Sequence, residues 1–89
     1  MSWVKVIGAA IGRKVFVNGN HVDAAGFVGT PFEVDPGLDT FELLTPSGSV
    51  EQSTSAVISG HPSKQNPQIV DIASGSAGTT GAMSGGSAP

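Results

Sequence analysis

Two histidines and a nearby carboxylate are the residues whose types and spacing first suggest chemistry. His21 and Asp23 are two positions apart, so a strand would carry both side chains on one face. An imidazole and a carboxylate placed in this way could supply two metal ligands, and His61 could be a third only if folding brought it close. Solvated side chains in turns are the default interpretation of such residues. The sequence therefore predicts no metal site and no cofactor.

Carboxylates and hydroxyls offer the other route to catalysis. Asp35, Asp39 and Glu42 cluster around one predicted turn, whereas a glycosidase needs two carboxylates on opposite walls of a cleft. The sequence contains no Gly-x-Ser-x-Gly elbow, and it offers only two histidines as bases that could activate a nucleophile. Walker, dinucleotide-binding and EF-hand patterns are also missing. We expect a non-catalytic protein.

Length and composition limit the class of protein. The 89 residues suit one small domain, and they include no cysteine for disulfides, thiolate metal sites or thiol nucleophiles. The net charge of -3 argues against a protein that binds nucleic-acid phosphates. Charged residues make up 12% of the chain, against about 25% in an average domain. Such a surface is either covered in the working state or coated with Gly, Ser and Thr.

The N-terminal residues do not have the pattern of a targeting signal. The apolar run at residues 6–11 is shorter than the hydrophobic region of a signal peptide, and Arg13 and Lys14 follow it directly. We expect neither a cleavable export signal nor a membrane-spanning segment, and no membrane partner.

Alternating apolar and polar residues between turn signals predict β-strands along the chain. The first two strands are expected at residues 3–7 and 14–17, which are rich in β-branched and aromatic side chains. Asn18 and Gly19 supply the two positive-φ positions of a type I′ turn, so residues 21–23 are expected to return as a partner strand. A longer polar strand is expected within residues 49–58, a loop at 59–67 and a last strand at 68–72.

A Gly-Thr-Pro corner precedes the central strands. Pro31 fixes its own φ, favours an extended Thr30 and removes a ladder donor, so the next strand is expected to begin only there. Gly29 stands where the chain must swing into that strand. We expect Gly29 to adopt a backbone conformation that is costly for other residues.

Two strands are predicted on either side of Pro36 and Gly37, meeting at a tight connection. In each strand the apolar side chains share one face and the polar ones the other. The register stays open, because an L-Pro-Gly turn of type II twists the wrong way for a two-residue hairpin and a longer loop is equally compatible. Phe32 opposite Phe41 would strengthen the pair, whereas like charges facing each other would weaken it.

The whole pattern predicts an all-β fold, a small antiparallel β-sandwich or barrel, because no segment keeps a 3.6-residue apolar period for three turns. The folding unit is expected to span residues 1–72. Residues 73–89 change to Gly, Ser, Ala and Thr without charge, and Met83 is their only large apolar side chain. Such a segment buries too little to offset its ordering entropy, so it is expected to be a flexible tail that works only in contact with a partner.

Several turn motifs together resemble a PEGA-type module, whose pattern is strand, Asp/Asn-Gly, Gly-Thr-Pro, strand, Pro-Gly, strand. The matching segments here are residues 15–19, 29–34, 36–37 and 40–43, so the resemblance runs from Val15 to Leu44. The interval between Asn18-Gly19 and Gly29 is longer than the family's usual spacing. The resemblance implies a small β-sandwich used as a spacer or docking surface, without catalytic residues.

Two non-catalytic functions follow from these observations. In the first, the chain is a structural subunit of a larger assembly, such as a capsid decoration or tail protein of a bacteriophage virion. It would then be found in the virion or the cytoplasm, and its partner would be itself or the major assembly subunit, contacted in part through Met83. In the second, it is a free-standing module whose Trp3 and Phe27 form a platform for a glycan, a peptide or a protein surface. Both aromatic residues could instead plug the ends of the fold.

Overall fold

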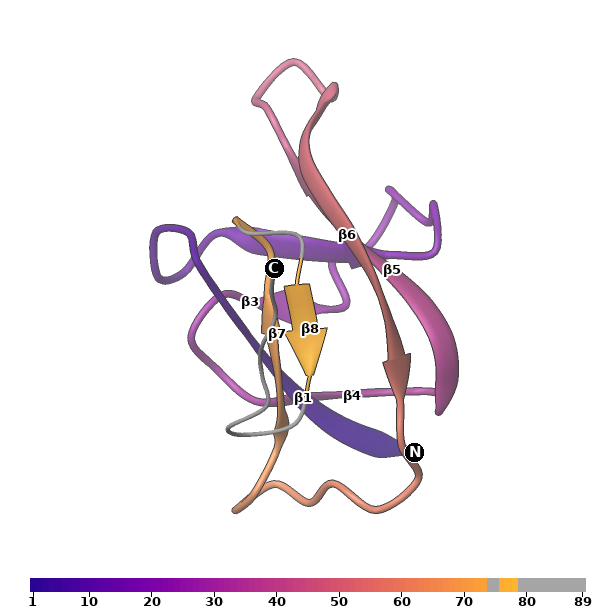
Figure 1. The fold of residues 1–89 in the computed structure, drawn as a ribbon. Coiled ribbons are helices and arrows are strands. Elements are labelled where there is room, and N and C mark those ends of the chain that lie inside the picture. The colour runs from indigo at the N-terminus through magenta and orange to yellow at the C-terminus, as the bar shows by residue number, and fades with distance from the viewer. Residues whose placement is uncertain (74–75, 79–89) are drawn as a thin grey trace.

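Two four-stranded sheets make up the protein in a computed structural model, which describes residues 1–73 and 76–78 (Figure 1). The strands are β1 (Ser2–Ile7), β2 (Lys14–Val17), β3 (Gly26–Phe27), β4 (Phe32–Val34), β5 (Gly37–Leu44), β6 (Val50–Ile58), β7 (Gln68–Asp71) and β8 (Ser76–Gly78). One sheet has the order β4-β1-β7-β8, and the other has the order β3-β2-β5-β6. No residue of the described part is helical. The all-β prediction is confirmed.

The first sheet is built around β1, which joins segments far apart in the sequence. β1 pairs antiparallel with β4, placing Val4 opposite Phe32, and parallel with β7, placing Val6 opposite Val70. A parallel pair needs a long connection, and here the whole second sheet lies between β1 and β7 along the chain. β1 and β7 are the one parallel pair among the ladders of the described residues.

The second sheet is dominated by the long hairpin of β5 and β6. Its register places Phe41 opposite Thr54 and shifts at Leu43 and Leu44. β2 lies on the other side of β5, with Phe16 opposite Glu42, and the two-residue β3 follows β2 at the far edge. The longer polar strand predicted within residues 49–58 is therefore confirmed as β6.

The core lies between the sheets and takes apolar side chains from both. Strand residues alternate between buried and exposed, as the period-2 pattern requires. Near β3 and β4 the layers come so close that a side chain at Gly26 would collide with the ring of Phe32. The buried apolar residues are Val4, Val6, Val15, Val28, Phe32, Val34, Phe41, Leu43, Ala56, Ile58, Val70 and Ile72.

The hairpin predicted across Pro36 and Gly37 is wrong. β4 pairs with β1 in the first sheet, and β5 pairs with β2 and β6 in the second, so the chain changes sheets at this corner. Gly37 permits the change with a φ of 108°. Phe32 and Phe41 consequently do not face each other across a ladder, although both belong to the core. A hairpin and a sheet change preserve the same alternation, so alternation did not distinguish them.

The return strand expected at residues 21–23 is also absent from the structure. Asn18 and Gly19 do form a turn with positive φ values of 56° and 77°, which Asn20 N–H closes by donating to Val17 O at 3.2 Å. The ladder stops at this bridge, and the strand that pairs with β2 is β3, after a loop. The turn prediction is confirmed and the strand prediction is wrong, because the turn fixes only the local reversal of the chain.

The last predicted strand exists as β7, and a further strand follows it. β8 lies inside the segment assigned to the tail and pairs antiparallel with β7, with Val70 opposite Ala77. β7 is therefore not the last strand. Most of the tail, including Met83, lies outside the described residues, and the division at residue 72 stays a prediction.

Candidate functional site

Trp3 lies on the outer face of β1, where another part of the same chain covers it. Its side chain is half-buried, and the Lys64 Nζ atom lies 5.7 Å from the ring centroid. The backbone N–H of Trp3 donates to Pro62 O at 3.4 Å. A cation over an aromatic face is a favourable contact, so the loop before β7 already uses the surface that was predicted to bind a ligand.

Phe27 lies on β3 in the other sheet, and 47% of its side-chain surface is exposed. Its ladder partner is Lys14. Because Trp3 and Phe27 belong to different sheets, the structure does not assemble them into one platform. Phe27 alone remains accessible to a partner.

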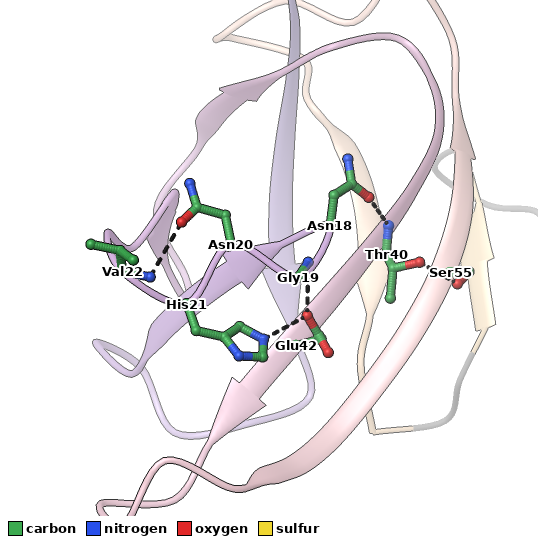
Figure 2. Close-up of polar contacts among 8 residues, drawn as sticks. All are labelled: Asn18, Gly19, Asn20, His21, Val22, Thr40, Glu42 and Ser55. Atoms are coloured by element: carbon green, nitrogen blue, oxygen red, sulfur yellow. Dashed lines mark hydrogen bonds and ion pairs between the residues drawn. The ribbon is translucent and has the colours of Figure 1, made fainter.

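The Asn18-Gly19 turn organises the polar contacts on the outer face of the second sheet (Figure 2). Asn18 exchanges two bonds with Thr40, since Asn18 N–H donates to Thr40 O and Thr40 N–H donates to Asn18 Oδ1, both at 2.8 Å. Gly19 N–H donates to Glu42 Oε1 at 3.2 Å. The turn therefore continues the pairing of β2 with β5 through a side chain where β2 itself ends.

His21 is placed by Glu42 and Phe16 and not by a metal-binding geometry. Its Nε2 atom lies 2.9 Å from Glu42 Oε1, and its ring and that of Phe16 form a T-shaped pair with centroids 5.7 Å apart. Asp23 is exposed, and His61 lies in the loop before β7. Across residues 1–73 and 76–78 no three metal-ligating side chains gather.

Asp39 is a buried carboxylate on β5 whose hydrogen-bond partner the sequence did not reveal. The residue faces inward from β5 and is 3% exposed. Asn18 Nδ2 donates to Asp39 Oδ1 at 2.9 Å, whereas Asp39 Oδ2 has no hydrogen-bond partner in the described part of the chain. A buried carboxylate needs donors to offset its lost hydration. Asn18 is therefore a structural anchor as well as a turn residue.

Gly29 occupies the predicted costly conformation, with a φ of 87°. Its N–H donates to Val6 O at 2.9 Å, which fastens the corner to β1. A Cβ at this position would lie 3.2 Å from two side-chain carbons of Ile11. The strand after Pro31 begins at Phe32, as predicted.

A groove of about 660 Å³ lies beside the turn, between β2 and the loop that joins β5 to β6. Arg13 crosses its lining, with one guanidinium nitrogen, Nη2, 2.6 Å from Glu51 Oε1 and 2.9 Å from Leu44 O. Lys14 and Phe16 also line the groove. The groove thus combines an aromatic edge, an ion pair and an exposed cation.

One end of the β5 and β6 hairpin presents two uncharged rows on its outer surface. We call Leu38, Thr40, Ser53, Ser55 and Val57 the hairpin face. Leu38 and Val57 stand directly opposite each other, with 71% and 72% of their surfaces exposed. Thr40 Oγ1 and Ser55 Oγ form the next row at 2.8 Å. Glu42 lies opposite Ser53 on the same side of the hairpin, so the uncharged part open to a partner is the apolar pair and the row of hydroxyls.

Comparisons with known proteins leave the family unassigned: no family model, curated protein or solved structure matches this chain. Within the described residues, no helix has the length and apolar character needed to cross a membrane.

Proposed function

We propose that this protein is a non-catalytic structural subunit of a larger assembly, such as a capsid decoration or tail protein of a bacteriophage particle. The observation that carries the proposal is the exposed Leu38 and Val57 pair on the hairpin face. Burying one such side chain in an interface is favourable by about 1.5–3 kcal/mol. The adjacent row, Thr40 and Ser55, is uncharged, so covering this end of the hairpin adds little cost of charge desolvation. This face suits permanent coverage by a protein partner, which is a second copy or the major subunit of the assembly.

Sedimentation velocity of wild-type protein and a Leu38→Thr/Val57→Thr variant tests the proposal. The wild type should associate with increasing concentration. The variant should fold but associate at least about tenfold more weakly, because each 1.4 kcal/mol is a factor of ten. Val22→Thr is the matched control, since Val22 is 87% exposed and lies in the loop after the Asn18-Gly19 turn. A wild type that stays monomeric, or equal effects of the two variants, would contradict association through this face.

The alternative is a free-standing PEGA-like module that binds a glycan, a peptide or a protein surface. The groove lined by Phe16 and Lys14 favours it, because an aromatic ring beside an exposed ammonium group suits a small polar ligand. Under this alternative the protein stays monomeric, and Phe16→Ala weakens ligand binding while Leu38→Thr does not.

A further inference from the structure

A slot lies between β7 and β6, where the two sheets approach each other. β8 occupies this slot: it pairs with β7 and lies alongside β6 (Figure 1). Among the described residues β6 forms a ladder with β5 alone. β8 thus forms the edge strand of the first sheet and lies beside β6, the edge strand of the second sheet.

Gln68 shows which backbone groups of β6 point into the slot. Its side-chain Nε2 donates to Val57 O at 2.9 Å, and its Oε1 accepts from Ser59 N–H at 3.1 Å. In an antiparallel ladder the N–H and C=O of one residue point to the same side, and alternate residues point to opposite sides. Since Val57 O points away from β5, the backbone groups of Ser55 and Ser53 do so as well. The side-chain amide of Gln68 therefore binds the end of the β6 edge at Val57 and Ser59. The backbone groups of Ser53 and Ser55 point toward the slot.

The length and sequence of β8 limit what it contributes to its own placement. It is three residues long beside the nine of β6, and its Ser-Ala-Gly sequence contains no large apolar side chain. Ordering a residue costs about 1–2 kcal/mol, and a backbone hydrogen bond contributes about 0.5–1.5 kcal/mol net. The two contributions nearly cancel, so another strand of the same kind can take the place of β8.

We infer that the slot exchanges strands between two copies of this chain, so that β8 of each copy pairs with β7 of the other. The inference rests on the proposed function. It names a second copy of this chain as the partner and β7 as the strand that accepts β8. The incoming strand has the same sequence as the outgoing one, so it fits the slot without new contacts having to be found. Four residues, Ile-Ala-Ser-Gly at 72–75, connect β7 to β8, and short connections favour exchange of identical elements.

Disulfide trapping tests the exchange, because the chain has no cysteine of its own. Ile69 lies opposite Gly78 in the ladder of β7 and β8, at a spacing that a disulfide can bridge after small adjustment. Ile69→Cys and Gly78→Cys chains are unfolded together, refolded as an equal mixture and oxidised mildly. Random pairing places one chain of each kind in about half of the dimers, and peptide mass spectrometry should find the 69–78 cross-link between chains.

A matched control uses a ladder that does not exchange. Trp3 lies opposite Glu33 between β1 and β4, so mixed Trp3→Cys and Glu33→Cys chains should give only background cross-linking. If either test chain fails to fold by circular dichroism, Asp71→Cys with Ser76→Cys replaces the pair, since these residues are also opposite.

The outcomes separate this inference from the proposed function. A 69–78 cross-link in clear excess over the control supports exchange. Association in sedimentation without that excess overturns exchange and leaves the hairpin face as the interface. A chain that neither associates nor cross-links overturns both.

Discussion

At the residue scale, Asn18 meets two requirements at once. Its φ of 56° lies in the left-handed region, which asparagine tolerates better than most side chains. Its amide also holds Thr40 N–H and the buried carboxylate of Asp39. The Asn-Gly pair was enough to predict the turn from sequence, because both residue types favour positive φ. The bond to Asp39 was not predictable, because it depends on how two distant strands pair.

Replacing Asn18 with alanine should lower the free energy of unfolding by about 1–3 kcal/mol, since it leaves the buried Asp39 without its donor. Urea denaturation measures the loss. Asn20→Ala is the control, because Asn20 is exposed and its side chain accepts a local bond from Val22 N–H at 3.2 Å. Equal stability of the two variants would show that the Asn18–Asp39 bond contributes nothing.

Gly29 is the second residue whose conformation matters. Gly29→Val should destabilise the protein by on the order of 1–3 kcal/mol, because valine is strained at positive φ, and the contact with Ile11 adds crowding. Gly48→Val separates the two causes, since Gly48 has a φ of 92° and open space around its Cβ position. Thermal melting should rank wild type above Gly48→Val and Gly48→Val above Gly29→Val. A Gly29→Val protein that melts like wild type would show that the corner is ordinary extended chain.

At the element scale, the strands were predictable and their partners were not. Period-2 alternation identified β2, β4, β6 and β7, together with most of β1 and β5, because each strand has one buried face. Pairing depends on which edges meet: β4 joins β1, and β5 joins β6. The approach of β3 to β4 was equally hidden, because a glycine in a strand pattern does not reveal which ring lies over it. Gly26 and Phe32 show this contact.

Gly26→Ala should destabilise the protein by about 1–3 kcal/mol, the usual cost of overpacking a core. The added methyl group would collide with the ring of Phe32. Chemical denaturation of Gly26→Ala, Phe32→Leu and the double variant should show positive coupling, because the smaller side chain makes room. Gly60→Ala is the control, since a Cβ there meets nothing within 4 Å. If the stability losses of the two single variants simply add up in the double variant, the side chain at position 26 does not contact that of Phe32.

At the scale of the whole molecule, the low charge of the chain and its exposed hairpin face both bear on association with a partner. The hairpin face is exposed at Leu38 and Val57, and the slot between β6 and β7 is filled by a strand of three residues beside the nine of β6. Composition allowed two interpretations, a surface covered in the working state or one coated with Gly, Ser and Thr, because charged residues are only 12% of the chain. It did not indicate where, since the exposed Leu38 and Val57 become neighbours only through the register of β5 and β6. The slot depends in turn on the parallel placement of β7 beside β1.

Truncation separates the folding role of the C-terminal residues from their role in association. A chain ending at Ile72 keeps the bond from Ile72 N–H to Ile7 O at 3.0 Å and loses β8. Its melting temperature should stay within about 4–8 °C of wild type, the shift that corresponds to 1 kcal/mol in a domain of this size, because the cost of ordering β8 nearly cancels its hydrogen bonds. Its association in sedimentation should weaken, whereas a chain ending at Gly78 should keep both properties.

Unfolding of the shorter chain would make β8 part of the essential core. Unchanged association would make residues 73–89 a passive extension and leave the hairpin face as the surface that binds the partner.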